Sequence, residues 1–584
     1  MTPRYLLERI GPFILVGAAL SCSGSGEPDG ADSGGSGSSG NDGSQTATGG
    51  GNGAGGRGGW GGDSGTAAEG CTTPPSAGYD PLASYVLEAR AATRVVTSAA
   101  DSGAGSLRAT VESAPDGAIV GFDASLSGKT IKLESTIELT RAITIDGAAA
   151  PGLTLDGGNS VQLLHYNGDS PTRIALFSLR LVGGRSEGSG GAISLNGGAI
   201  DFEVGGCVFE DNASSEGGAI RIGYDKGTSA HIHDSVFINN DGSLPGGGNG
   251  FSGGAVSTSG GYLTVSRCRF EGNQGPTTGA VYTIHSDPIV EDSVFVGNRS
   301  TRPDGGSGAF FADGGGRGNY GTDYGDPKNQ VAGQITLRRV RFEGNQGAGD
   351  DGGAVEAYAY PMDIVTFEGC VFRDNDSNPG RAGGAFIHAD KEVHILSTAF
   401  VGNSSTQPGA AIWADGDAVY RIENSLFSGN ITDGDLGGAL RLNISEAAEL
   451  WIQNSTFTDN EATNGNGVLW MGGERNAHVK NSIFANNTGP QWAQQINFPV
   501  TNDGGNILWP DPDTSSPSLS GATVVDPQLG ALDVLDGVEV RAPKASSPAI
   551  DAAVAPALAA DQRGAQRDAK PDVGAVEAGV SCEQ

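Results

Sequence analysis

Residues that could do chemistry recur at one place in this chain, directly after a repeated phrase, Gly-Gly-Ala followed by an aliphatic residue. If the phrase opens a short strand, the next residue points outward, and the residue two positions on shares its face. The predicted outward column is Ser194, Arg221, Ser257, Tyr282, Phe311, Glu356, Ile387, Trp413, Arg441 and Trp470; two positions on follow Asp313, Tyr358 and Asp415. Exposed aromatic rings and carboxylates on one flat face suit the binding of sugar rings.

The candidate ligand-binding residues are therefore Tyr282, Phe311, Tyr358, Trp413, Trp470, Asp313 and Asp415. A second interpretation stays open, in which loops at 241–252 and 299–335 fold over these rings and bury them. The sequence does not decide whether the loop at 314–334 covers the site or builds it.

A second constellation combines carboxylates with arginines. The acidic pairs Asp350-Asp351 and Asp374/Asp376 are one repeat apart, and Arg338 and Arg339 are nearby. Ca²⁺ prefers six to eight oxygen ligands, several of them from aspartate, and a basic residue could take the proton next to a uronate carboxylate. The other interpretation is that Asp350 and Asp351 are solvated turn formers before Gly352. Ca²⁺ is the only cofactor that these residues suggest.

Histidines offer a third constellation. His231 and His233 share one strand face and suggest zinc, while His394 and His478 occupy the repeat position of His231, five and eight repeats later. We expect no four-ligand cluster, and the chain has no Cys-x-x-Cys, so a zinc site is not predicted. The chain also has no phosphate-binding loop and no serine nucleophile elbow.

The elements that position these residues come from a repeat of Phe, two variable residues and Asn. Its copies are Phe209–Asn212, Phe237–Asn240, Phe270–Asn273, Phe295–Asn298, Phe342–Asn345, Phe372–Asn375, Phe400–Asn403, Phe427–Asn430, Phe457–Asn460 and Phe484–Asn487. The regular recurrence of this phrase along the chain indicates a solenoid. An apolar residue stands five positions before each Phe and a small residue, as a rule, two positions before it. The apolar and the small residue are thus three positions apart, as are Phe and Asn, and an odd spacing would place two side chains on opposite faces of an unbroken strand. These spacings therefore predict chain bends between short strands, with the Asn at a corner in left-handed backbone.

Stacked turns about 4.8 Å apart would place Phe on Phe inside and run the Asn amides as a ladder along one edge. The predicted fold is all-β, a right-handed parallel β-helix. Leu107, Val111 and Ala114 have helical spacing, so a short N-terminal capping helix is expected over 104–114. An irregular segment is expected to cap the C-terminal end.

The paired Phe-x-x-Asn and Gly-Gly-Ala-Ile phrases resemble the repeats of polymorphic outer-membrane proteins and, more broadly, the pectate-lyase-like superfamily of right-handed β-helices. The resemblance covers about residues 140–490 and is specific for fold rather than for activity. It implies polysaccharide lyases or glycoside hydrolases as the enzymes to consider. Gly349-Asp350-Asp351 also resembles one motif of polygalacturonase-like hydrolases, whose Gly-His-Gly motif is absent here.

The cysteines divide into two groups. Cys207, Cys268 and Cys370 occupy the same small inward column, about 10 Å or more apart along the axis, which is too far for a disulfide. They are predicted to be buried free thiols. Cys71 and Cys582 flank the repeats, and the sequence leaves open whether they pair across the ends of the domain.

The N-terminal region resembles the leader of a bacterial lipoprotein. Arg4 and Arg9 precede the apolar stretch 10–20, and Ala19-Leu20-Ser21-Cys22 resembles a lipobox, which implies lipidation of Cys22. Ser23 then implies the outer membrane, surface-exposed or facing the periplasm. The alternative is an ordinary signal peptide and a secreted protein. The predicted divisions are 1–22 signal peptide, 23–70 disordered Gly/Ser-rich tether, 71–139 entry and cap, 140–500 β-helix and 501–584 C-terminal cap.

The net charge of −33 argues against nucleic acid and against an anionic membrane surface as partners. We therefore expect a monomeric cell-surface lipoprotein, held at the membrane by its lipid alone, whose β-helix binds extracellular polysaccharide or another surface partner without catalysis. The alternative is a Ca²⁺-dependent lyase or a glycoside hydrolase on the same face.

Overall fold

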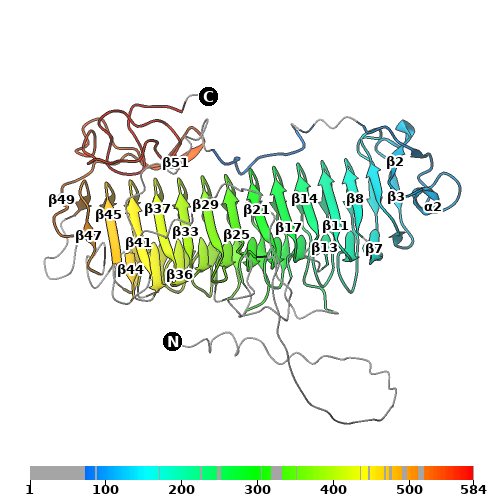
Figure 1. Cartoon of the computed structure of the whole chain (residues 1–584), viewed down its shortest axis with the longest axis horizontal. Coiled ribbons are helices and arrows are strands. Elements are labelled where there is room, and N and C mark those ends of the chain that lie inside the picture. Colours follow the sequence, from blue (N-terminus) through cyan, green and yellow to red (C-terminus); the bar gives the residue numbers. More distant parts are fainter. Residues whose placement is uncertain are drawn as a thin grey trace, which may run out of the picture. The chain divides into compact units, whose positions relative to one another are not determined.

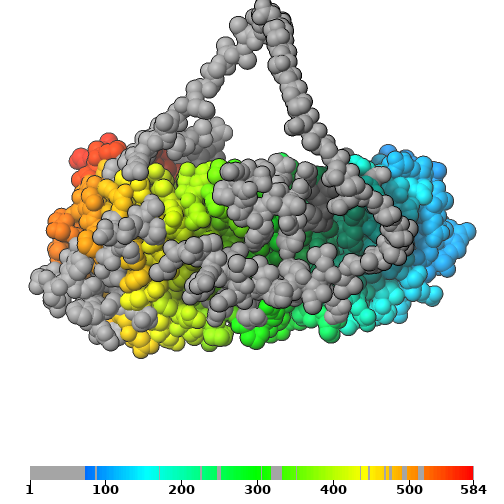
Figure 2. Space-filling model, turned by 60° about the horizontal axis from the view of Figure 1, so that its bottom comes forward, coloured from blue at the N-terminus to red at the C-terminus, as the bar shows by residue number. Residues whose placement is uncertain are grey.

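Each repeat makes one turn of a parallel β-solenoid in the computed structural model, which has about 13 turns (Figure 1). Neighbouring turns pair strand to strand in parallel, which confirms the all-β solenoid fold. Figure 2 shows the sequence colours following one another along this body, so consecutive turns are neighbours. The structure describes residues 73–83, 85, 89–169, 171–223, 227–245, 252–303, 306–316, 332–349, 351–434, 436–444, 448–465, 469–472, 476–489, 496, 498–510 and 519–582.

Sheet A has 15 strands. Its residues alternate, so that β14 buries Ala230 and Ile232 while His231 points outward. The strands are β1 (Arg94–Val96), β2 (Ala118–Phe122), β5 (Ile143–Asp146), β8 (Thr172–Phe177), β11 (Ile200–Gly205), β14 (Ser229–His233), β17 (Tyr262–Ser266), β21 (Asp287–Glu291), β25 (Gln334–Arg338), β29 (Ile364–Glu368), β33 (Glu392–Leu396), β37 (Val419–Glu423), β41 (Glu449–Gln453), β45 (Asn476–Lys480) and β47 (Thr501–Asn502).

Sheet B carries the repeated Phe and also has 15 strands. All ten Phe side chains are fully buried, and neighbouring ring centroids lie 4.5–5.0 Å apart, as predicted. The strands are β3 (Thr130–Lys132), β6 (Thr154–Asp156), β9 (Arg180–Val182), β12 (Val208–Glu210), β15 (Val236–Ile238), β18 (Arg269–Glu271), β22 (Val294–Val296), β26 (Arg341–Glu343), β30 (Val371–Arg373), β34 (Ala399–Val401), β38 (Leu426–Ser428), β42 (Thr456–Thr458), β46 (Ile483–Ala485), β48 (Ile507–Trp509) and β49 (Thr523–Val524).

The repeated Asn side chains form the predicted ladder. The side-chain amide of Asn212 and its backbone N–H both donate to Oδ1 of Asn240, at 3.0 and 3.1 Å, and the Asn240 amide donates to the carbonyl of Phe209 at 3.0 Å. The same side-chain bonds continue, turn by turn, to Asn487. The ladder therefore satisfies buried backbone groups where the chain leaves sheet B.

The corners differ from the prediction in one respect. The repeated Asn was expected to adopt left-handed backbone, but the residue directly before it does so, as at Asp211 (φ 53°) and Asn239 (φ 53°). A second left-handed corner precedes the small residue, as at Asp234 (φ 48°). The physical reason is that the Asn side chain must point inward to reach the next Asn, so the reversal falls one residue earlier.

Sheet C has 12 strands, and the short sheet D has seven. Sheet C contains β4 (Ile137–Leu139), β7 (Leu164–Gly168), β10 (Ile193–Gly197), β13 (Ile220–Ile222), β16 (Val256–Ser259), β20 (Val281–Ile284), β24 (Phe310–Asp313), β28 (Val355–Tyr358), β32 (Ala385–His388), β36 (Ile412–Gly416), β40 (Leu440–Ile444) and β44 (Leu469–Met471). Sheet D contains β19 (Gln274–Gly275), β23 (Arg299–Ser300), β27 (Gln346–Gly347), β31 (Asp376–Ser377), β35 (Ser404–Ser405), β39 (Ile431–Thr432) and β43 (Glu461–Ala462).

The Gly-Gly pair of the repeat lies where the chain enters sheet C. A Cβ at Gly218 would stand 2.2 Å from the carbonyl oxygen of Gly254 in the next turn. Only glycine therefore lets neighbouring turns approach this closely.

Helical structure within the described residues is short. The helix α2 (Leu107–Ser113) buries Leu107 and Val111 and contacts β1 and β4, and its N-cap Ser106 accepts a hydrogen bond from the backbone N–H of Ala109. A 3₁₀ turn, η1, spans Ala124–Leu126.

Two segments cover the outer face of sheet B. The C-terminal segment, residues 519–582, begins with β49, the last strand of sheet B, and then includes the antiparallel pair β50 (Asp533–Leu535) and β51 (Val538–Val540). It folds back along the solenoid: Val554 exchanges hydrogen bonds with Asn481. The N-terminal segment, residues 73–83, continues along the same face, where Arg341 donates to the carbonyl of Pro75. Figure 1 shows both segments beyond the carboxyl ends of the sheet A strands.

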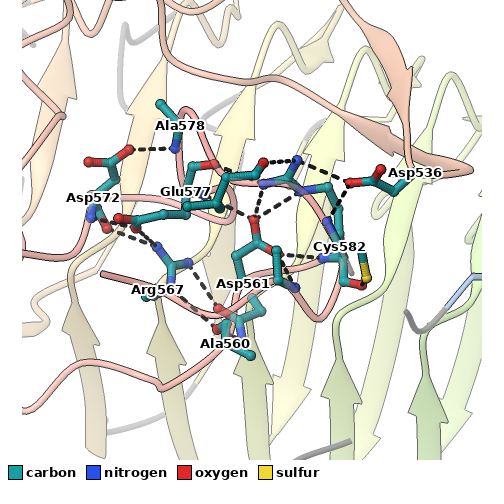
Figure 3. Close-up of polar contacts among 12 residues, drawn as sticks. Asp536, Ala560, Asp561, Arg567, Asp572, Glu577, Ala578 and Cys582 are labelled. Carbon is teal, nitrogen blue, oxygen red and sulfur yellow. Dashed lines mark hydrogen bonds and ion pairs between the residues drawn. The ribbon is translucent and has the colours of Figure 1, made fainter. Parts of the chain in front are cut away.

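Buried charges hold the C-terminal segment together (Figure 3). Arg567 donates to Glu577 and to the carbonyl of Asp572, and Glu577 accepts from the backbone N–H of Asp572 at 2.8 Å. Across the two segments, the hydroxyl of Thr73 donates to the carbonyl of Asp536 at 2.8 Å. The segment expected as an end cap thus lies alongside the solenoid.

The cysteines of the core are free and buried, as predicted for Cys207, Cys268 and Cys370. Burial raises the pKa of each thiol to about 12. Cys582 is disulfide-bonded. Cys22 and Cys71 lie outside the described residues, as do the predicted signal peptide and tether, so the lipidation and the Cys71–Cys582 pairing stay predictions.

Candidate functional site

The outer face of sheet C carries the predicted aromatic column, with one correction. In-register pairing places Glu356 beside Phe386, and Phe386 beside Trp413. Ile387, predicted to point outward, is a fully buried core residue. The Gly-Gly-Ala phrase at 383–385 lies one residue further into the strand than the same phrase in other turns. A shift of one residue exchanges the inner and outer faces of a strand.

Most rings of this column are covered. Tyr282, Phe311 and Trp413 are 6%, 8% and 6% exposed, which agrees with the second interpretation, in which these rings are buried. Tyr282 stacks on Phe311 at 5.3 Å between ring centroids, and Phe386 stacks on Trp413 at 4.9 Å. Tyr358 and Trp470 remain half-buried.

Two arginines cover rings on this face. The guanidinium of Arg381 lies 4.4 Å from the centroid of the Trp413 ring, and Arg381 also pairs with Asp351. The guanidinium of Arg441 lies 4.1 Å from the centroid of the Trp470 ring. Cation–π contacts of this kind hold both the rings and the charges in place.

The predicted carboxylates beside the rings are engaged with neighbours. Asp415 and His388 form a hydrogen bond of 2.5 Å. Burial by itself would lower the pKa of His388, but the hydrogen bond with Asp415 and the charges of Asp390 and Asp417 raise it overall. Together they make a polar, partly exposed pair on the outer face of sheet C.

Asp313 lies in a more buried cluster at the edge of the same sheet. It accepts a hydrogen bond of 2.5 Å from the hydroxyl of Tyr360, and the His285 ring stacks on Tyr360 at 5.4 Å. Burial raises the pKa of Asp313 and lowers the pKa of His285. Both shifts favour the neutral forms of these side chains.

The candidate lyase residues are not brought together. Arg338 lies on sheet A and pairs with Glu368 and Glu291, and Arg339 pairs with Asp292. Asp351 is buried before β28 of sheet C, beside Arg381, and Asp350 lies outside the described residues.

The remaining calcium candidates also have other partners. Asp374 pairs with Arg373 at a corner after sheet B, and Asp376 in sheet D accepts a hydrogen bond from Ser404. Neither belongs to a metal-binding group of three or more side chains in the part of the chain that the structure describes.

Sequence reasoning named His231 and His233 on the outer face of sheet A but missed the third member of their group, Glu203. Glu203, His231 and His233 converge there, with one potential ligand atom of each within 4.8 Å of the others. Glu203 occupies the same repeat position as His231, one turn earlier. Counting acidic residues as well as histidines in that column would have found the group. The pKa of His231 is lowered, first by burial and then by the proximity of His233.

The chain matches no known protein-family model and no curated protein. Within the described residues, no helix combines the length and the apolar character that crossing a bilayer requires.

Proposed function

We propose that this chain is a non-catalytic cell-surface protein whose sheet C face binds an extended extracellular polysaccharide or another surface partner. The observation that carries the proposal is a row of rings and charges on one flat face over consecutive turns, from Tyr282 to Trp470. Stacked turns repeat about every 4.8 Å, so an extended polymer could meet equivalent groups in succession. The net charge of −33 favours an uncharged or basic polymer over an acidic one.

The half-exposed groups are the ones that a ligand would reach first. Tyr358 and Trp470 supply ring faces, Arg441 supplies hydrogen-bond donors, and His388 with Asp415 supplies a polar pair. Aromatic platforms with a few fixed polar groups are typical of ligand-binding surfaces. Attachment through Cys22 and the 23–70 tether belongs to the same proposal and rests on the sequence alone.

A Ca²⁺-dependent lyase is the alternative, and it has less support. Its basic candidates lie elsewhere, Arg338 at the end of β25 in sheet A and Arg339 at the corner that follows, whereas Asp351 precedes sheet C and pairs with Arg381. General-base chemistry requires the base within hydrogen-bond reach of the proton that it takes.

A binding screen tests the proposal. The full chain is applied to an array of neutral, basic and acidic polysaccharides, with and without Ca²⁺, and unsaturated uronate products are measured by absorbance. We expect retention without product. Trp470→Ala and Tyr358→Ala should each weaken retention at least about 5-fold, the effect of about 1 kcal/mol.

The matched control is Tyr262→Ala, an aromatic side chain that is 42% exposed on sheet A and should not affect retention. Absence of retention, or equal retention by all three variants, would refute the proposal that the outer face of sheet C binds the ligand. Formation of unsaturated uronate products would support the Ca²⁺-dependent lyase and contradict a non-catalytic binding protein.

A further inference from the structure

Three side chains on sheet A meet between two neighbouring turns. Glu203 in β11 stands directly opposite His231 in β14, and His233 lies on the same face two residues on. The His231 and His233 ring centroids are 4.7 Å apart, and Nε2 of His233 is 3.5 Å from Oε1 of Glu203. Two imidazoles and a carboxylate are a ligand set that zinc and related ions take.

The neighbours of His233 leave one nitrogen facing this group. Nδ1 of His233 is 2.8 Å from Oδ2 of Asp234, which occupies that nitrogen and leaves Nε2 toward Glu203. Asp234 is held in turn by two hydrogen bonds from Arg267, at 2.7 and 2.8 Å. In metal sites, a carboxylate on the second ring nitrogen fixes the tautomer and the orientation of the ligating histidine.

Glu203 is oriented in a similar way. Its Oε2 pairs with Arg173, so Oε1 is the oxygen directed at His233. Around a tetrahedral ion with bonds of 2.0–2.1 Å, neighbouring ligand atoms are about 3.3 Å apart. The 3.5 Å separation between Oε1 and Nε2 is close to that value, and small side-chain rotations bring in His231.

We propose that Glu203, His231 and His233 bind a divalent transition-metal ion of the zinc class, with Asp234 as the positioning carboxylate. The nitrogen ligands select zinc, copper or nickel over calcium, which prefers oxygen. His231 is exposed, so the ion is reached from solvent and its fourth position is open to water. The ring of Tyr85 lies beside His233 and borders the site there, with 6.1 Å between the two ring centroids. The site lies on sheet A and is independent of the sheet C proposal.

Metal titration of the full chain tests the site. After removal of metals with a chelator, Zn²⁺ is added against a competing coloured indicator, and Co²⁺ is added while its visible absorption is recorded. We expect saturation at one ion per chain and a Co²⁺ spectrum of low coordination number. An excess of Ca²⁺ should not displace either ion.

Four variants assign the ligands. His231→Ala and Glu203→Gln should each weaken Zn²⁺ binding at least about 10-fold, and Asp234→Asn about 10–100-fold, as expected for an outer carboxylate. His394→Ala is the control, because His394 occupies the same outer column of sheet A five repeats on and should leave the affinity unchanged. His231 is exposed, so its replacement leaves the core intact, which circular dichroism checks.

Three outcomes would overturn the site: no saturable Zn²⁺ binding, unchanged affinity in His231→Ala, or an equal loss in His394→Ala. In each case the group would be a metal-free polar cluster, in which Asp234 and Glu203 contact the two ring nitrogens of His233.

Discussion

At the scale of single residues, carboxylates of this acidic protein change the pKa of particular neighbours, and His388 is the clearest example. Its pKa is raised because the hydrogen bond to Asp415 and the nearby carboxylates outweigh the effect of burial. A histidine whose folded-state pKa exceeds its unfolded value near 6.5 adds stability that is fully present below about pH 6.5. That stability is lost as the pH rises through the folded-state pKa.

Asp415→Asn should therefore lower the thermal unfolding midpoint more at about pH 5.5 than at about pH 8.5. The cause is the loss of the charge that stabilises protonated His388. Histidine ring signals in NMR spectra give the pKa directly and should show the pKa of His388 falling in this variant. An equal loss of stability at both pH values would contradict this role.

Residues inside the repeat were predictable, and residues that depend on irregular parts of the chain were not. The inward direction of each Phe and Asn follows from spacing alone, because every turn must match the next. The burial of Trp413 involves Arg381, which lies between the Phe-x-x-Asn and Gly-Gly-Ala phrases, where the sequence does not repeat from turn to turn. The meeting of Glu203 with His231 followed from the register, but only if unlike side chains were compared across turns.

At the scale of elements, the Phe column joins the turns of sheet B. Phe342 is fully buried between Phe295 and Phe372, with ring centroids 5.0 and 4.9 Å away. Phe342→Ala should cost about 3–5 kcal/mol, because a large cavity remains. In a solenoid each turn contacts only its neighbours, so hydrogen exchange should rise first in the turns that hold Phe295, Phe342 and Phe372.

Mass spectrometry of deuterium uptake measures this effect turn by turn. Tyr262→Ala, at an exposed position of sheet A, is the control and should change stability by less than about 0.5 kcal/mol. Uniform uptake along the whole solenoid would show that the column does not act locally.

At the scale of the whole molecule, the two terminal segments turn sheet B from an exposed apolar face into a buried one. Leu532 of the C-terminal segment packs on Val371, Ala399 and Leu426, and Val573 packs near Ile483. The sequence predicted an irregular C-terminal segment but not its path, because contacts between unlike, non-repeating residues decide that path. These segments leave sheets A and C as the faces that carry the two proposed sites.

One buried ion pair joins the C-terminal segment to the solenoid. Arg341 of β26 donates to Glu539 of β51 at 2.7 Å, and the two side chains are 7% and 1% exposed. Glu539→Ala leaves the buried Arg341 charge near Arg373 with only Glu343, 3.4 Å away, as an acidic partner, so the cost should be about 3 kcal/mol, the low end for such pairs. The C-terminal segment should then open at least about 100-fold more often, and limited proteolysis should cut within 519–582 correspondingly faster. The repeats should stay intact, because their ladders do not depend on this contact.

Glu392→Ala, at an exposed acid on sheet A, should leave the cleavage rate as it is. Cleavage that begins within the repeats, or at an unchanged rate, would mean that the segment is held by its apolar contacts rather than by this pair.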